Sequence, residues 1–317
     1  MDVPWRRLLT LFLFMPLCVH AQPWRAAAGI ASSHELKIGE ATIQVDFANG
    51  QMDLTAEQVL QHIRDAAEAI TAYYGRFPVA RARILVVPTQ GGRREAIGGT
   101  TWGDVDGFPA FTRLRIAEHA TQADLDSDWV TTHELDHMAF PDVPEENHWI
   151  EEGLASYIEP IARVMTGNLD ARSIWADMVR GMPQGEPVAG DQGLDHTHTW
   201  GRTYWGGALF CLVADVEIRR QTGNRKGLRD ALRAVVVKGG TIDHNWPLDR
   251  AFAIGDEATA THVLSETYAK WKDAPVEVDL PKLWEELGVR KADDGVQLLP
   301  NAKLAAVRNA ITTRGSH

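Results

Sequence analysis

The pentapeptide His133-Glu134-Leu135-Asp136-His137 decides how the rest of this sequence is interpreted. The segment around it is predicted to be helical, and each helical residue turns the chain by about 100°. His133, Glu134 and His137 therefore lie on one face of that helix. Two imidazoles one turn apart can hold a zinc ion, and the adjacent carboxylate can accept a proton from the attacking water. The spacing predicts metal-assisted hydrolysis.

The overall composition is that of a globular protein with an acidic balance. The chain has 317 residues, of which 44% are hydrophobic and 24% charged, enough for one large domain or two small ones. The formal net charge is −11, and no basic stripe offsets it, so we expect no nucleic-acid partner. Past the N-terminal region, no stretch is apolar enough to predict a membrane span. The composition does not indicate the oligomeric state.

The first residues have the pattern of an export signal. Two arginines precede an apolar run over 8–19, which has the length of a signal-peptide core and is too short to span a bilayer comfortably. A cleavage-site pattern ends at Ala21, so the sequence predicts a signal peptide over 1–21 and a periplasmic or secreted protein. An uncleaved interfacial anchor is the alternative. Cleavage would leave a single cysteine, Cys211, which we expect to be a small buried apolar residue.

Hydrophobic periodicity predicts an α+β fold in which a small mixed sheet precedes a mostly helical half. Strand patterns occur at 34–48, 82–87 and 111–116, with a further strand region after Gly98. Helical patterns occur at 54–74, 129–140, 147–165 and 204–221, and over most of 228–288. A polar, Gly-rich stretch at 181–201 is predicted to be a flexible loop beside a cleft. We expect one catalytic unit over 22–317, with a β-rich part at about 34–118, a helical part at about 126–290 and a tail at 291–317.

Three aspartates precede the helix that carries the pentapeptide. Asp124, Asp126 and Asp128 alternate as in a calcium loop, but the Gly and the distal Glu that such a loop requires are missing. Side-chain oxygens at the start of a helix accept hydrogen bonds from its free N–H groups, and carboxylates suit the helix dipole. We therefore predict that Asp126, Ser127 or Asp128 caps this helix, and that no calcium binds there.

A catalytic zinc site needs a third protein ligand and an open fourth position. The chain offers one shortly after the pentapeptide, in a predicted helix that reads Trp149-Ile150-Glu151-Glu152-Gly153. Two helices joined by a short loop can bring a carboxylate of one against the imidazoles of the other. By length alone, either Glu151 or Glu152 could be the third ligand.

H-E-x-x-H followed by a Trp-x-x-Glu-Gly helix resembles the gluzincin metallopeptidases, most closely the aminopeptidase N and glycyl-aminopeptidase families. In those enzymes the Glu before the Gly is the third zinc ligand, so the resemblance selects Glu152. It implies a thermolysin-like fold with one Zn²⁺ ion between the sheet and the helical half. The resemblance further implies that His133, His137 and Glu152 hold the ion and that Glu134 is the general base.

Two further residues complete the predicted site. Tyr204-Trp205-Gly206-Gly207-Ala208 resembles the Tyr-x-x-Gly-Ala segment of these families, in which the tyrosine hydroxyl stabilises the developing oxyanion, so Tyr204 is implied as a catalytic residue. Glu159 lies almost on the same helical face as Glu152, where it can orient a ligand imidazole or simply form a salt bridge. Three other histidines are left out of the metal site, although two of them and an arginine are candidates for substrate contact: His148, His196 and His198, with Arg202.

One motif of the aminopeptidase N family is missing. Those enzymes carry Gly-x-Met-Glu-Asn on the strand before the zinc helix, and its Glu binds the free amine of the substrate. This chain has Gly98-Gly99-Thr100-Thr101-Trp102 in the comparable region. We therefore expect an exported zinc peptidase acting on peptides or proteins, with endo- and exopeptidase activity both open. An inactive peptidase-like binding protein and a zinc amidohydrolase for cell-wall amides are the alternatives.

Overall fold

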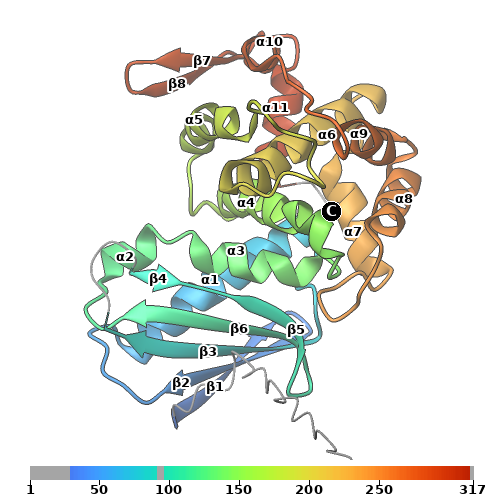
Figure 1. The fold of residues 1–317 in the computed structure, drawn as a ribbon. Helices are drawn as coiled ribbons and strands as arrows, with labels where there is room; N and C mark the ends of the chain where they lie inside the picture. The colour runs from blue at the N-terminus through green and yellow to red at the C-terminus, as the bar shows by residue number, and fades with distance from the viewer. Residues whose placement is uncertain (1–28, 91–95, 315–317) are drawn as a thin grey trace, which may run out of the picture.

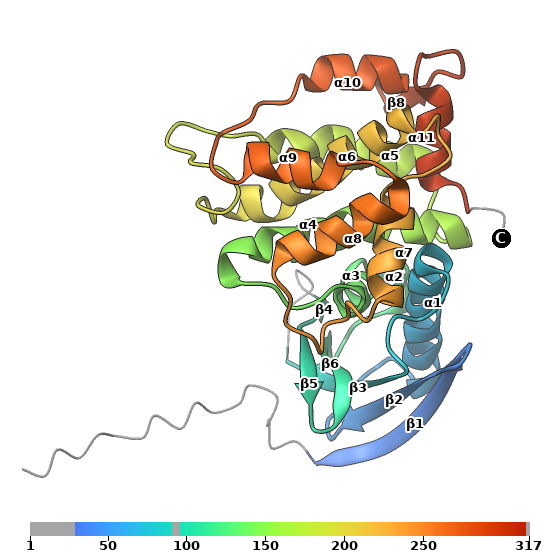
Figure 2. The same cartoon turned by 90° about the vertical axis from the view of Figure 1, so that its right-hand side faces the viewer.

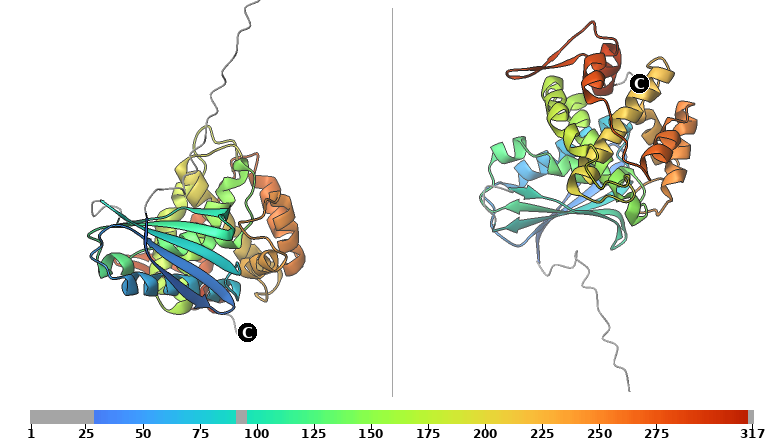
Figure 3. Two further views of the ribbon diagram at one scale, coloured as in Figure 1. Left: turned by 90° about the horizontal axis from the view of Figure 1, so that it is seen from below. Right: turned by 45° about the horizontal axis from the view of Figure 1, so that its top comes forward.

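A computed structural model describes residues 29–90 and 96–314 of the chain. The predicted signal peptide at 1–21 lies outside the described residues, and so does the end of the predicted tail at 315–317. In the described part, a mixed sheet forms one layer and helices cover one of its faces (Figure 1). The view from below shows the strands crossing in front of the helices (Figure 3). The α+β prediction is confirmed.

The sheet has six strands, and its two shortest strands lie along one edge. The strand bounds are β1 (Ile30–Ile38), β2 (Ala41–Ala48), β3 (Arg81–Thr89), β4 (Ile97–Gly98), β5 (Thr101–Val105) and β6 (Phe108–Ala117). The order is β1-β2-β3-β6-β4, and β5 also pairs with β6. The central pairs β2–β3 and β3–β6 are parallel, whereas β1, β4 and β5 are antiparallel to their neighbours. The strip formed by β4 and β5 is therefore a free edge of the sheet.

Alternation along the strands separates a core face from an outer face. On β6, Thr112, Leu114 and Ile116 point to the helices, and the two apolar ones join the main core. Phe111 lies on the opposite face in a small cluster with Leu85. The core face packs against α1 (Ala56–Tyr74), which begins at a capping box of Thr55 and Gln58 and ends at a left-handed glycine, Gly75.

A second layer of helices carries the candidate site. It contains α2 (Gln122–Asp126), α3 (Val130–Asp136), α4 (His148–Thr166), α5 (Ala171–Gly181) and α6 (Gly207–Gln221). The α3 helix continues into a 3₁₀ turn, His137–Ala139, so the predicted helix over 129–140 is present in two parts. The α4 helix contacts α1, α3 and α6 and is the central helix of the molecule. A π-helical turn, Gly201–Gly206, leads into α6.

In the C-terminal part, residues 280–298 lie farthest from the sheet, whereas residues 228–237 contact α1 (Figure 2). This part contains α7 (Leu228–Val237), α8 (Leu248–Thr259), α9 (Val263–Trp271), α10 (Leu280–Leu287), a hairpin of β7 (Val289–Ala292) and β8 (Gly295–Leu298), and α11 (Ala305–Thr312). The hairpin and α11 fall where the sequence predicted only a tail. No helix in the described ranges is both long and apolar enough to cross a membrane. Cys211 is buried and free of any disulfide, as expected.

The prediction of a flexible loop at 181–201 is only partly correct. Its first residues complete α5 and form a 3₁₀ turn, Met182–Gly185. The remainder is irregular but anchored by buried carboxylates. Asp195 accepts hydrogen bonds from Trp149 Nε1 at 2.8 Å and from the Tyr268 hydroxyl at 2.7 Å. These contacts hold the segment against the helical layer, and it does not line the cleft described below.

Candidate metal centre

The pentapeptide helix begins at a carboxylate cap. Asp128 accepts hydrogen bonds from the backbone N–H groups of Val130 at 2.9 Å and Thr131 at 3.0 Å, as one of the three predicted capping residues. His62 of α1 lies 2.8 Å from the same carboxylate. Burial would raise the pKa of Asp128, but the hydrogen bonds from His62 and Thr131 and the charge of His62 together hold the pKa below the ordinary value. The cap fixes α3 against α1.

Three predicted ligands converge at the C-terminal half of α3. The donor atoms of His133, His137 and Glu152 all lie within 4.8 Å of one another. Glu152 Oε2 is 3.1 Å from His133 Nε2 and 3.9 Å from His137 Nε2. A tetrahedral zinc ion with bonds of about 2.0–2.2 Å separates its ligand atoms by about 3.4 Å. The donor types and their spacing therefore fit one zinc ion.

The structure distinguishes Glu152 from Glu151, which the loop length alone left as equal candidates for the third ligand. Glu152 points to the imidazoles, whereas Glu151 Oε2 pairs with His148 Nδ1 at 3.0 Å. His148 Nε2 also lies 3.4 Å from Glu152 Oε1, so this histidine bridges both glutamates from one turn away. The sequence analysis left His148 out, although its i, i+3 and i, i+4 spacing to two acidic residues was a signal for this contact.

The ionisation of His137 and Glu152 suits a cation. Burial lowers the pKa of His137 to about 4, so its imidazole is neutral at physiological pH. Burial would lower the pKa of His133 too, but its hydrogen bond with Glu152 and the charges of Glu152, Glu134 and Asp136 together raise it above the ordinary value. Burial opposes ionisation of Glu152, yet the hydrogen bonds to His133 and His148 hold its pKa far below the usual range. The centre thus contains a fixed carboxylate charge.

Glu134 contacts the edge of the sheet. The Thr101 hydroxyl donates a hydrogen bond to Glu134 Oε2 at 2.8 Å. A side chain at Gly99 would overlap the Glu134 carboxyl group, with its Cβ only 2.7 Å from Cδ, so glycine is needed there. Burial raises the pKa of Glu134, while His133 and the Thr101 hydroxyl oppose the rise. A carboxylate with a raised pKa is a better proton acceptor, as a general base requires.

Two glycines explain how Tyr204 reaches the same centre. Gly153 of α4 and Gly207 of α6 pack face to face, since a Cβ on Gly207 would lie 2.7 Å from Gly153 Cα. This close approach brings the π-helical turn beside the ligands. The Tyr204 ring stacks on His133 with 6.3 Å between centroids and 21° between planes. Burial, with a smaller effect of Glu152, raises the pKa of Tyr204 to about 12, so its hydroxyl stays protonated and can donate a hydrogen bond.

Other candidate residues have different partners. Glu159 Oε1 accepts a hydrogen bond from Arg163 Nη1 at 2.7 Å, and no hydrogen bond joins it to either ligand imidazole among the described residues. Arg202 is buried in an ion pair with Asp191 at 2.7 Å, so it is not available to a substrate. Of the loop histidines, His196 pairs with Asp273, and neither it nor His198 lines the cleft.

The centre opens into a cleft of about 1020 Å³. One wall is the β4–β5 edge from Ile97 to Asp104, and the other contains the three ligands, Glu134 and Tyr204. A loop at 242–245 closes one end. The volume is that of a site for a ligand larger than a single amino acid.

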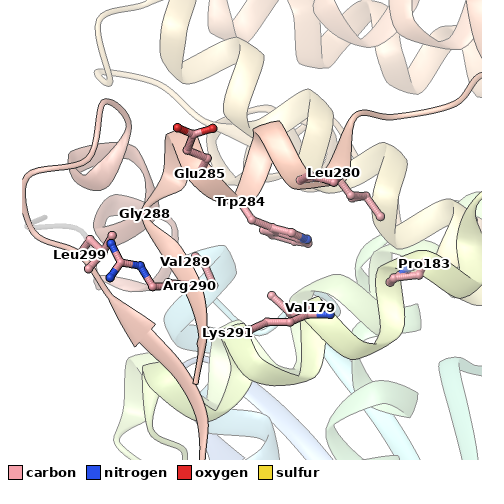
Figure 4. Close-up of a pocket in the computed structure, with 11 residues that line it drawn as sticks. Val179, Pro183, Leu280, Trp284, Glu285, Gly288, Val289, Arg290, Lys291 and Leu299 are labelled. Atoms are coloured by element: carbon pink, nitrogen blue, oxygen red, sulfur yellow. The ribbon is translucent and has the colours of Figure 1, made fainter. Parts of the chain in front are cut away.

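A separate apolar hollow of about 670 Å³ lies between α5, α10 and the β7–β8 hairpin. Trp284 and Leu280 of α10 face Val179 of α5, and Arg290 and Lys291 stand at its rim (Figure 4). None of the candidate ligands lines this hollow. The catalytic candidates therefore belong to the polar cleft alone.

Comparison with known proteins supports the fold at long range. No family model and no curated protein matches the chain. Among solved structures, an aminopeptidase N family protein from Idiomarina loihiensis matches with a TM-score of 0.59 and 14% identity, covering 81% of this chain and 49% of that one. A two-domain M1 zinc metallopeptidase, solved as a variant with bound L-arginine, matches with a TM-score of 0.51 and 14% identity, covering 79% and 53%.

The chain therefore spans about half the length of these two proteins. At 14% identity the likeness shows the fold alone: this chain is folded like part of M1 zinc metallopeptidases. The possible metal site of His133, His137 and Glu152 is a separate observation on the chain itself. The predicted gluzincin-like architecture agrees with both.

Proposed function

We propose that the protein is a zinc-dependent peptidase. The observation that carries the proposal is the convergence of His133, His137 and Glu152 in a cleft that also contains Glu134 and Tyr204. The M1-like fold supports a hydrolase of peptidase type. The signal-like N-terminus supports export to the periplasm or the medium, where peptide and protein substrates would be met.

Each residue has a role that follows from its chemistry. Zinc, when bound, supplies a Lewis acid that makes water more acidic and polarises the scissile carbonyl. Glu134 accepts the proton of the attacking water and passes it to the departing amine, and Thr101 holds its carboxylate in place. The Tyr204 hydroxyl donates a hydrogen bond to the oxyanion as its charge develops. His148 fixes the second oxygen of Glu152 and so positions this ligand.

The decisive experiment joins metal analysis with peptide digestion. The purified chain is loaded with zinc, its zinc content is measured, and the same sample is incubated with a peptide library in free and N-acetylated forms. We expect one zinc ion per chain. We also expect cleavage of both the free and the N-acetylated peptides, because the amine-binding Glu of aminopeptidase N is missing. Cleavage of free N-termini alone would instead make the protein an aminopeptidase.

The variant Glu134→Gln separates chemistry from folding. We expect zinc to be retained and turnover to fall at least 10³-fold, since a general base contributes roughly 10²–10⁴-fold and the attacking water loses its orientation as well. Unchanged turnover would reject the general-base assignment. Zinc binding without cleavage of any peptide by the parent chain would reject the peptidase, and digestion of cell-wall material would then test the amidase alternative.

A further inference from the structure

The free edge of the sheet offers a substrate a place to bind as an added strand. The residues 97–105 run along β6, and no strand covers their other side among the described residues. This strip lines the cleft opposite the ligands. An extended peptide can pair with such an edge through its backbone. Its alternate side chains then contact the side chains that lie along the strip.

One cation stands over this edge. Arg115 of β6 is paired with Gly98 of β4, and its guanidinium lies across the glycine: a Cβ there would be 2.9 Å from Nη2. The absence of a side chain at Gly98 lets Arg115 reach from the second strand to the free edge. Its side chain is exposed, and its positive charge acts on Glu134, whose pKa it helps to lower against the effect of burial. Among the described residues that line the cleft, it is the one arginine or lysine.

Acidic groups gather at the opposite end of the same strip. Gly103 packs against the backbone of the 242–245 loop, with its Cβ position 3.0 Å from the Asp243 nitrogen. Asp104 follows Gly103 and Asp142 bridges to Asn245, so these acids line that end of the cleft. At about 3.3 Å per residue, the five steps from Gly98 to Gly103 separate the cation from the acids by about 17 Å. The strip therefore has a cation at one end and acids near the other.

The general base lies next to the cation on this strip. Gly99, the neighbour of Gly98, contacts Glu134, so the guanidinium is within about one or two residues of the position where a bond would be cut. We propose that Arg115 binds a carboxylate of the peptide substrate, either its C-terminus or an acidic side chain, and makes the enzyme selective for bonds close to that charge. This inference rests on the proposed peptidase function.

The selectivity is measured on matched peptides by kcat/KM. Each peptide is supplied with a free C-terminal carboxylate or an amide, and with Glu or Gln near the scissile bond, so the two sources of a carboxylate are separated. We expect the parent chain to favour one carboxylate source roughly ten- to hundred-fold, as is typical of a charge-assisted hydrogen bond. Arg115→Gln should remove the preference, Arg115→Lys should keep part of it, and Arg115→Glu should favour Lys near the bond.

The control is Arg290→Gln, which removes an exposed arginine of the β7–β8 hairpin outside the cleft and should leave all ratios unchanged. If the parent chain cleaves peptides and Arg115→Gln retains the same carboxylate ratio, the inference is overturned while the peptidase stands. If the parent chain cleaves nothing, the peptidase fails, and binding of the same peptides still decides the role of Arg115. Equal Kd values for acid and amide forms would then overturn it.

Discussion

The two walls of the cleft are built in different ways. The helical wall holds its groups by burial and by contacts that fix their positions: Gly153 against Gly207, and Glu152 between His133 and His148. The strand wall is a half-buried edge, on which the exposed guanidinium of Arg115 lies over Gly98. The groups proposed to break the bond are therefore fixed by packing, whereas the cation of the strand wall, Arg115, has a side chain that is free to move.

The largest effect should come from breaking the helical wall at its ligand. Glu152→Gln removes the negative charge that His133 and His137 face, and loss of partners around a ligand alone costs 10–100-fold in metal affinity. We expect zinc affinity to fall more than 100-fold and peptide cleavage to disappear. Competition with a zinc chelator measures the affinity.

The matched control is Glu151→Gln on the same helix. Its carboxylate contacts His148 rather than the imidazoles of the centre, so zinc affinity should fall no more than about tenfold. If the two variants lose zinc equally, the structure has assigned the third ligand wrongly and the two glutamates share the role.

Tyr204→Phe should have the next largest effect. It removes one hydroxyl and leaves the ring stacked on His133, so packing is preserved. Loss of one oxyanion donor typically lowers kcat by about 10²–10³-fold. We expect this loss in kcat with KM and zinc content nearly unchanged, measured by steady-state kinetics on the peptide found in the library. A change confined to KM would make Tyr204 a substrate-binding residue only.

Adjacent glycines of the strand wall allow a direct comparison of the two walls. In Gly99→Ala the new Cβ would collide with the carboxyl group of Glu134, which helix α3 holds in place, so activity should fall about tenfold or more. In Gly98→Ala the Cβ meets the flexible end of Arg115, which can move aside, so the carboxylate preference should weaken while the cleavage of amidated peptides falls less. The kcat/KM for both peptide types separates these results. Equal losses in the two variants would mean that the edge acts as one rigid unit.

The sequence predicted the helical wall far better than the strand wall. Helix geometry alone placed His133 and His137 on one face, whereas Glu152 was preferred to Glu151 only because the segment resembles the gluzincin peptidases. The contact between Arg115 and Gly98 depends on strand register, which periodicity does not specify. The same limit applied to Arg202, whose partner Asp191 could not be inferred from their positions in an irregular segment.

The hairpin and α11 were missed for a related reason. The hairpin strands are short, four residues each, with mostly exposed side chains on β7, so they carry little hydrophobic alternation. The helix α11 packs through only one short apolar face after a polar connection. Elements of this length are specified by the surface they pack on rather than by their own periodicity: α5 and α10 for the hairpin, and α4, α6 and α10 for α11.

The smallest expected effect concerns the start of the helical wall. Asp128→Ala removes the cap of α3 and the partner of His62, which should lower the free energy of unfolding by about 1–2 kcal/mol.

Because the folded pKa of Asp128 is below its ordinary value, its contribution is complete above pH about 4 and is lost as the pH falls through the folded pKa. Urea unfolding at pH 7 and at pH 3 should therefore show a smaller difference between the parent and the variant at pH 3. Asp126→Ala is the control and should change stability little at either pH, because the exposed Asp126 side chain accepts a hydrogen bond from Gln122 of its own short helix. A gap between parent and Asp128→Ala that stays constant with pH would show that the cap acts through packing, and that charge does not secure the helix carrying His133.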